Sequence, residues 1–358
     1  MRIAPLLLLP TLVGVLSAQT VVIPALRTGT DGSSGGALAG ADQRFRMQVL
    51  LDASSLGPVV GHAVTSVAFR RDGQHREAWQ GGRASLTVRL STSARPSGEA
   101  VAAFDANHGA DLQDVFSGEI VVPATQPLAT RDGAQWAAPD AIAITFDRPF
   151  AYAGGTLCVE IEGTPVSGSA SPWWRIDHEL YGHNAQVASS GVSCDSFSNA
   201  FASRNTLLPG GSLDLICTGP RGATAVLLLG GSAITPGLDL GFLGAPGCRA
   251  SVLPATTIAA IVGVGPATGY AAANLTLQLP PAPWLAGSRL HAQWAVFPNL
   301  RNGALLTTTN ALELTLASLP SPLPGVLVRT GPLTASEPWP TSGRVYPQLL
   351  PVVQVGYR

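Results

Sequence analysis

The stretch closest to a known catalytic pattern is His178–His183 (HELYGH). Zinc proteases place two histidines four residues apart on a helix, so that both ring nitrogens reach one ion. Here the two histidines are five residues apart, Gly182 lies between them, and no helical pattern surrounds them. Because a catalytic zinc needs ligands at the right spacing, we predict no metal here and expect a loop with surface histidines.

The segment Asp105–Asp111 (DANHGAD) carries oxygen-bearing side chains at alternate positions. Calcium takes six to eight oxygen ligands, and such loops can supply them. The EF-hand pattern, however, requires an acid or Asn at its fifth position, where Gly109 stands, and a Glu at its twelfth, where Phe116 stands. A polar connection fits this segment better than a calcium site, so no cofactor is predicted, with calcium as the alternative. The Gly- and Ser-rich segment Thr30–Asp42 is also expected to be a loop.

Four aromatic residues are candidates for contact with a ligand: Trp173, Trp174, Tyr181 and Trp284. Adjacent aromatic side chains in an exposed loop can stack on sugar rings or anchor a partner. The alternative is that Trp173 and Trp174 fill the seam between two domains, where large apolar residues usually serve packing. We favour packing in the seam and keep contact with a glycan or a cell-surface component as the alternative.

No residue pattern indicates covalent or acid–base catalysis. Glu160 and Glu162 face one side of a predicted strand, which would suit the floor of a glycosidase site. On the outer face of a sheet they are more simply solvated charges. The sequence has no G-x-S-x-G elbow, and Gly263–Pro266 lacks the lysine and the helix of a phosphate-binding loop. No catalytic residue is therefore predicted.

Alternation of apolar and polar residues is the dominant pattern along the chain. Apolar residues occupy every second position in Arg44–Leu51, Ser85–Leu90, Thr156–Glu162 and Leu312–Leu316. This period is typical of antiparallel sheets with one buried and one wet face. The 40 Gly and 29 Pro interrupt any long helical stripe. We predict an all-β fold with two antiparallel β-sandwich domains in tandem, jelly-roll or immunoglobulin-like.

The chain starts with one basic residue, a short apolar run and the small pair Ser17-Ala18, as secretory signal peptides do. The run is shorter than the roughly 20 residues of a membrane-spanning helix, and no later stretch is predicted to span a membrane. We therefore expect a secreted, periplasmic or cell-surface protein. The predicted organisation is a signal peptide (1–18), an N-terminal sandwich (20–165), a linker with a Trp- and His-rich loop (166–204), a C-terminal sandwich (205–318) and a Pro-rich tail (319–358). The last residues of that tail, Leu349–Tyr357, are expected at most to add an edge strand.

Charge is sparse and balanced. Charged residues make up 12% of the chain, all 21 basic residues are Arg, and the net charge is −1. Nucleic-acid binding needs clustered Lys or Arg for phosphate contacts, and no basic stripe is present. Nucleic acid is therefore excluded as a predicted partner.

Four cysteines, Cys158, Cys194, Cys217 and Cys248, follow the predicted signal peptide. An even number in an exported chain predicts disulfides, and four cysteines allow three pairings. A zinc site is not expected, because no two of them lie within five residues of each other. Cys158 lies on the polar face of its predicted strand and should point away from the core. Cys217 shares a face with the apolar residues of its strand, so a buried free thiol is the alternative there.

Several phrases occur in an order that resembles a family of uncharacterised secreted bacterial two-domain β-sandwich proteins. The phrases are Arg44–Ser54 (RFRMQVLLDAS), Val67–Asp72 (VAFRRD), Val88–Ser93 (VRLSTS), Ala103–Asp114 (AFDANHGADLQD), Gly154–Ile161 (GGTLCVEI), Leu238–Cys248 (LDLGFLGAPGC) and Thr309–Glu313 (TNALE). The resemblance implies export and a sandwich fold, and it adds no mechanism. It also implies that Cys194 pairs with Cys248, which would leave Cys158 to pair with Cys217 across the two domains. A more local scheme, Cys158 with Cys194 and Cys217 with Cys248, stays open.

Together these features predict an exported, non-catalytic β-sandwich protein with a binding or structural role at the cell exterior. The first alternative is a carbohydrate-binding accessory protein that uses Trp173, Trp174 or Trp284. The second alternative is an extracellular hydrolase whose site is built from dispersed carboxylates.

Overall fold

The computed structural model describes residues 18–166, 174–182, 184–195, 197–264, 271–297, 305–318 and 323–358. These residues form antiparallel strands and short 3-10 turns, and no helix among them exceeds three residues. The all-β prediction is confirmed. Within the described part of the chain, no helix has the length and apolar character needed to cross a membrane. The predicted signal peptide lies outside the described residues, apart from Ala18.

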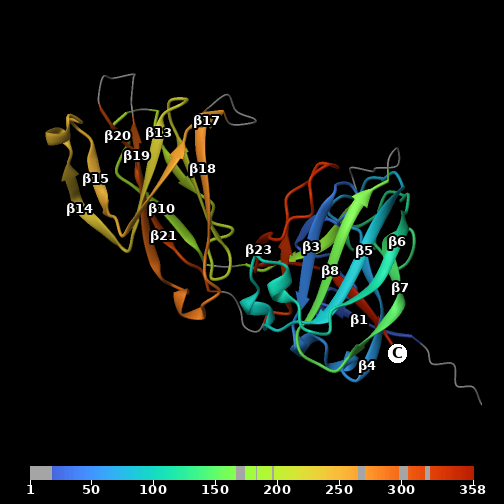
Figure 1. Ribbon diagram of the computed structural model, residues 1–358. Helices are drawn as coiled ribbons and strands as arrows, with labels where there is room; N and C mark the ends of the chain where they lie inside the picture. The colour runs from blue at the N-terminus through green and yellow to red at the C-terminus, as the bar shows by residue number, and fades with distance from the viewer. Residues whose placement is uncertain are drawn as a thin grey trace, which may run out of the picture.

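Three sheets surround a first hydrophobic core (Figure 1). Their strand orders are β23-β22-β3-β8-β5-β6, β1-β25-β4-β7 and β2-β9-β24. The bounds are β1 Gln19–Ile23, β2 Ser34–Ala37, β3 Phe45–Leu51, β4 His62–Arg70, β5 Gly82–Thr92, β6 Gln113–Val122, β7 Ala141–Tyr152, β8 Leu157–Pro165, β9 Arg175–Leu180, β22 Gly325–Arg329, β23 Arg344–Tyr346, β24 Leu349–Pro351 and β25 Val353–Tyr357.

Two further sheets enclose a second, separate core. Their orders are β10-β21-β19-β13-β16, with β20 also paired to β19, and β11-β12-β18-β17. A two-stranded ribbon, β14-β15, extends beyond the β13–β16 pair and carries the end of the molecule farthest from the first core (Figure 1). The bounds are β10 Gln186–Ser190, β11 Ala200–Ala202, β12 Ser212–Thr218, β13 Thr224–Gly230, β14 Ser232–Asp239, β15 Arg249–Leu253, β16 Thr256–Ile261, β17 Gly263–Val264, β18 Ala271–Gln278, β19 Arg289–Phe297, β20 Thr307–Thr308 and β21 Ala311–Thr315.

Eight 3-10 turns connect these strands within the described ranges. They are η1 Ala25–Arg27, η2 Ala53–Ser55, η3 Gly57–Val59, η4 Ser97–Glu99, η5 Asp105–Asn107, η6 Arg131–Gly133, η7 Gly241–Leu243 and η8 Pro283–Leu285.

The period-two pattern explains how each core is filled. Alternate residues of β3 and β8, such as Met47, Val49, Val159 and Ile161, point into the first core. The second core takes alternate residues in the same way and is centred on the fully buried Trp294. Burying an apolar side chain such as Val, Ile or Met contributes about 1.5–3 kcal/mol, so these alternating residues provide much of the stabilisation of both cores.

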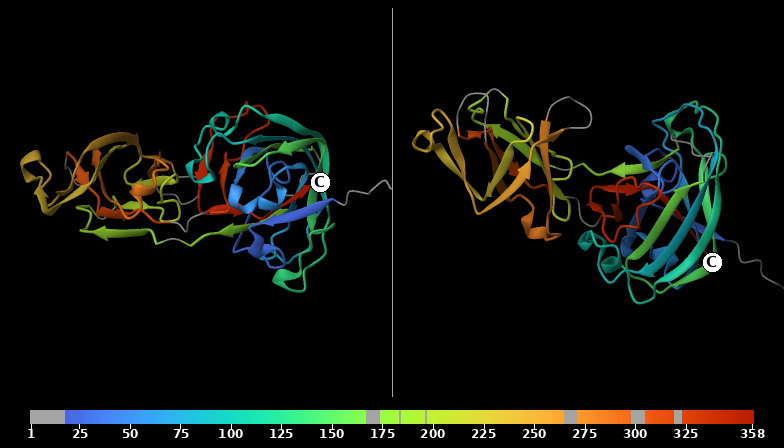
Figure 2. Two further views of the ribbon diagram at one scale, coloured as in Figure 1. Left: turned by 90° about the horizontal axis from the view of Figure 1, so that it is seen from below. Right: turned by 45° about the horizontal axis from the view of Figure 1, so that its top comes forward.

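The chain returns to the first core at its end, which corrects the predicted Pro-rich tail. Strand β22 pairs with β3, and β25 lies between β1 and β4, not at an edge. The reason is that Leu327, Val353 and Val355 alternate with smaller or polar neighbours and fill the first core. Figure 2 shows this C-terminal strand beside the N-terminal one.

The predicted linker, 166–204, is also partly built into sheets. Strand β9 pairs with β2 and β24 around the first core, and β10 pairs with β21 around the second. The short crossing between these two strands therefore joins two sheet systems directly, where we expected a long connection without strands.

Cys194 and Cys248 form a disulfide, as the resemblance implied. It ties the connection between β10 and β11 to the loop that joins β14 and β15. Cys158 and Cys217 are free and buried, so neither scheme that paired them is right. Cys158 does lie on the outer face of β8, but that face is covered by a small third cluster that includes Phe104 and Val328. Cys217 is the buried free thiol that its strand pattern allowed.

Candidate functional sites

The polar faces of three neighbouring strands meet in one cluster. In the strand order β3-β8-β5, Gln48 and Arg89 lie directly opposite Glu160 from either side, and Arg46 lies opposite Glu162. Directly opposed residues in an antiparallel sheet have neighbouring side chains on the same face. All of these side chains except the partly exposed Arg89 are buried, because the segment around η5 folds over them, so the expectation that both glutamates are solvated is wrong.

Glu160 is the centre of this cluster. Its Oε2 accepts hydrogen bonds from Arg46 Nη2 at 2.8 Å and Gln48 Nε2 at 2.7 Å, and its Oε1 accepts one from Arg89 Nη1 at 2.7 Å. Burial raises the pKa of this carboxyl, but the hydrogen bonds from His108 and the arginines outweigh burial and hold the pKa at about 2. Glu160 is therefore ionised and paired, which disqualifies it as a general acid near neutral pH.

A serine and a histidine extend the cluster in an order that superficially matches nucleophilic catalysis. Ser91 Oγ lies 2.8 Å from His108 Nδ1, and His108 Nε2 lies 3.1 Å from Glu160 Oε2. A nucleophile, a base and an orienting carboxylate in a line would activate the serine. However, Ser91 is fully buried and the His108 side chain is only 5% exposed, so a substrate has no access to the hydroxyl. The line serves to hold the loop that carries His108 against the sheet.

The calcium candidate Asp105–Asp111 belongs to that same loop. The Asn107 amide donates to Gln48 Oε1 at 3.0 Å, and Asp111 Oδ1 accepts the Thr92 amide at 2.9 Å. These oxygens and nitrogens bind the protein itself. Across the described ranges, no group of three or more His, Cys, Asp or Glu residues is arranged to hold a metal ion.

His178 is not the surface histidine we expected. It lies on β9 with its side chain buried, and its Nδ1 is 2.9 Å from the carbonyl of Ile176. Burial lowers the pKa of His178 to about 4, so the ring is neutral near pH 7. His183, the other histidine of the zinc-like stretch, lies outside the described residues.

A second set of ion pairs fastens the segment that was predicted to be a loop at Thr30–Asp42. Within it, β2 pairs with β9, and the buried Asp31 accepts from Arg131 at 2.6 Å. Nearby, Arg70 donates to the buried Asp177 at 2.6 Å. Each acid has a cationic partner within the protein, although burial raises the pKa of Asp177 to about 7.

The aromatic candidates differ in their positions and in how far they are buried. Trp174 is fully buried in the first core, 5.6 Å from Trp79, so it neither contacts a ligand nor fills a seam. Tyr181 packs against the same core and is half-buried. Trp173 lies outside the described residues. Among the candidates that the structure describes, only Trp284, which is 77% exposed on η8, has the surface position that ligand contact requires.

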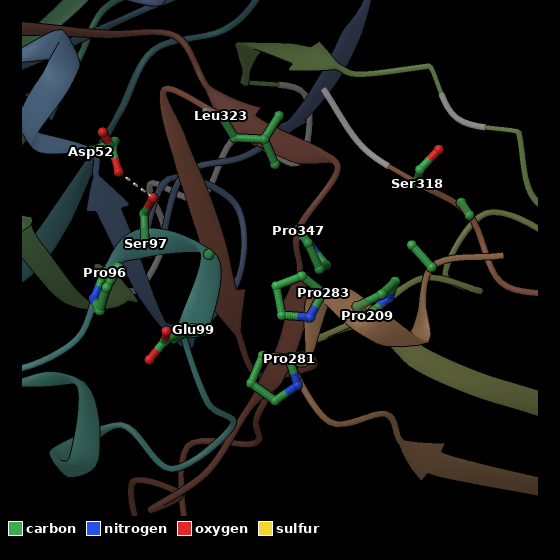
Figure 3. Close-up of a pocket in the computed structure, with 13 residues that line it drawn as sticks. Asp52, Pro96, Ser97, Glu99, Pro209, Pro281, Pro283, Ser318, Leu323 and Pro347 are labelled. Atoms are coloured by element: carbon green, nitrogen blue, oxygen red, sulfur yellow. Dashed lines mark hydrogen bonds between the residues drawn. The ribbon is translucent and has the colours of Figure 1, made fainter. Parts of the chain in front are cut away.

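A pocket of about 380 Å³ lies between the two sheet systems. Figure 3 shows its walls: Asp52, Ser97 and Glu99 come from the first system, and Pro209, Pro281 and Pro283 from the second. Trp284 directly follows Pro283 on the turn that forms one wall. The pocket thus combines hydrogen-bonding oxygens with rigid apolar walls, and Trp284 is next to a wall residue in the chain without lining the pocket itself.

Asp52 in this pocket is occupied by its neighbours. Its Oδ1 accepts from the Ser54 hydroxyl at 2.7 Å and its Oδ2 from Ser97 at 2.9 Å. Burial opposes ionisation, but these hydrogen bonds outweigh it and lower the pKa of Asp52. The carboxylate can accept a hydrogen bond from a ligand and is poorly suited to donate a proton.

The sequence prediction missed Arg46, Arg89, Ser91 and His108 as members of one cluster. The alternation could show which residues lie on the polar face of each strand, but it could not show the order of the strands in the sheet. No protein-family model matches the chain, and no curated protein is significantly similar to it.

Proposed function

We propose that the chain is an exported, non-catalytic binding protein of the β-sandwich family that its sequence resembles. Each core with its sheets would form one jelly-roll or immunoglobulin-like domain, with the second inserted between strands of the first. The signal-peptide-like start and the Cys194–Cys248 disulfide support export. The observation that carries the binding role is the pocket between the two sheet systems, with Trp284 beside it.

Carbohydrate is the ligand class that this pocket favours. Sugar sites combine an aromatic surface for the ring with carboxylate and hydroxyl groups for its hydroxyls. Here Asp52, Ser97 and Glu99 line the pocket and would offer the polar groups, and the exposed Trp284, which follows the wall residue Pro283, would offer the aromatic surface. A volume of about 380 Å³ lies in the range of small-molecule sites.

The state of the carboxylates argues against hydrolysis. A glycosidase needs one carboxylic acid with a raised pKa facing a second carboxylate. In the pocket, hydrogen bonds lower the pKa of Asp52. Outside it, Glu160 is ionised and buried. These features support binding over hydrolysis.

A glycan array with the processed protein tests the proposal. We expect binding to a neutral glycan that falls at least about tenfold in Trp284→Ala, because stacking on an aromatic ring contributes about 1–3 kcal/mol. Phe242→Ala is the matched control, since Phe242 is 73% exposed on η7, at the far end of the ribbon. Equal losses in both variants, or no glycan bound by the wild type, would contradict the proposal. Release of reducing sugar from a bound glycan would instead favour the hydrolase.

A further inference from the structure

Two arginines lie directly opposite each other at the β23 edge of the six-stranded sheet of the first core. Arg329 of β22 pairs in register with Arg344 of β23. Both guanidinium groups approach the ring of Tyr346, with their central carbons 5.6 Å and 5.3 Å from its centroid. Like charges directly opposite each other destabilise a sheet, so the pair requires a source of negative charge.

The protein itself supplies only part of that charge. Arg344 forms an ion pair with Asp214, which comes from β12 of the second sheet system. The Arg329 side chain has no hydrogen bond or ion pair to any residue that the structure describes, and its Nε is buried without a partner. Asp42 is close enough for its pKa to respond to Arg329, but none of the ion pairs among the described residues joins these two side chains, so Asp42 offsets the Arg329 charge only from a distance.

The two arginines open into a pocket of about 460 Å³ within the loop between β22 and β23. Pro332, Pro340 and Gly343 form rigid or small walls, and no Asp or Glu lines the pocket. A cavity of this size is large enough for a sugar-sized molecule. The charged residues of its lining are therefore both cationic, and the rest of the lining mixes apolar or small residues with Thr330 and Ser342.

We propose that this pocket binds a small organic carboxylate, with Arg329 as the principal contact. A guanidinium group presents two parallel N–H donors that match the two oxygens of a carboxylate. The bound anion would offset the repulsion between Arg329 and Arg344. Tyr346 and the two prolines would contact the body of the ligand. The site is distinct from the pocket beside Trp284 and does not depend on its function.

Titration calorimetry with glucuronate as the probe and glucose as its uncharged match tests the site. We expect glucuronate, and not glucose, to bind the wild type, with affinity that falls as salt is added. Arg329→Gln should weaken binding at least about tenfold, because a hydrogen bond to a charged group contributes about 1.5–3 kcal/mol. Arg148→Gln, which removes an exposed arginine of β7, should leave the affinity unchanged.

Two additional variants keep the test decisive. Arg329→Lys retains the charge but lacks the fork of donors, so partial binding by a folded Arg329→Lys protein is expected even if Arg329→Gln fails to fold. Trp284→Ala should bind glucuronate like the wild type, which separates this site from the proposed glycan pocket. Equal affinity for glucose and glucuronate, absence of glucuronate binding, or full affinity in both Arg329 variants would overturn the proposal.

Discussion

Replacement of Glu160 by Gln should destabilise the first core strongly. The variant removes the carboxylate that accepts hydrogen bonds from Arg46 and Arg89, and it leaves their charges without this partner under the covering loop. Breaking a buried ion pair by removing one partner costs about 3–5 kcal/mol. That cost is a large fraction of the roughly 5–15 kcal/mol by which proteins are usually stable.

The pH dependence of stability gives an independent estimate for the same group. The pKa of Glu160 is about 2 in the folded protein, against 4.5 for an ordinary glutamate. A depressed pKa means that the stabilisation is complete above the unfolded value and is lost as pH falls from 4.5 toward 2. At about 1.4 kcal/mol for each pKa unit, the full contribution is about 3 kcal/mol, of which about 2 kcal/mol is lost by pH 3.

Urea unfolding at pH 7 and at pH 3, followed by tryptophan fluorescence, measures both effects. The control is Glu119→Gln, because Glu119 pairs with Arg83 at 3.0 Å on the same sheet with both side chains about half exposed. An exposed pair contributes at most about 1 kcal/mol. The difference in unfolding free energy between the wild type and Glu160→Gln should be smaller at pH 3 than at pH 7. A Glu160→Gln variant no less stable than the control at pH 7, or a gap that is the same at both pH values, would refute this account of the cluster.

Three other outcomes are expected. Changing Cys194 and Cys248 together to Ser should lower the unfolding free energy of the second core by about 4 kcal/mol in the chain-entropy model, because the bond spans 54 residues. Hydrogen exchange should show this loss of protection in the second core and little change in the first core. Trp174→Ala should cost about 3–5 kcal/mol in urea unfolding, whereas Trp284→Ala should change stability by less than about 0.5 kcal/mol. Burial raises the pKa of the Cys158 thiol well above its ordinary range, so a thiol reagent should modify Cys158 only after urea is added. Rapid labelling of Cys158 in the native protein would show that the segment covering it opens.

Strand content and the faces of many strands could be predicted from alternation alone. In Phe45–Leu51 and Leu157–Ile161 the apolar positions point into the first core, as their period of two requires. The disulfide was predicted correctly only through the resemblance, because spacing left three pairings open.

The errors about buried side chains share one physical cause. Alternation predicts the two faces of a strand, but it does not predict which other segment covers a face. Cys158 and Glu160 lie on the predicted polar face of β8, yet the segment that carries Phe104 and His108 folds across that face and buries both. Covering segments are distant in sequence and make side-chain contacts that no local pattern encodes. The same limit applies to Trp174, whose partner Trp79 lies in a different connection.

Loop segments rich in proline were also misjudged for a physical reason. The predicted tail contains enough proline to suggest an extended chain, but Gly325–Arg329 and Val353–Tyr357 contain no proline and are mostly apolar. Such short runs gain stability only when a sheet with an open edge is available. The edges they use belong to strands near the N-terminus, so the pairing could not be found from neighbouring residues.

The placement of β25 between β1 and β4 sets the order in which the protein can mature. In the described part of the chain, the strands of the second core all lie between Gln186 and Thr315, so that core can close while the rest of the chain is still being synthesised. The first core must wait for the final five-residue strand, Val353–Tyr357. Until that strand arrives, β1 and β4 each present an unpaired edge to other chains, and a product cut short near Val352 would carry those edges permanently.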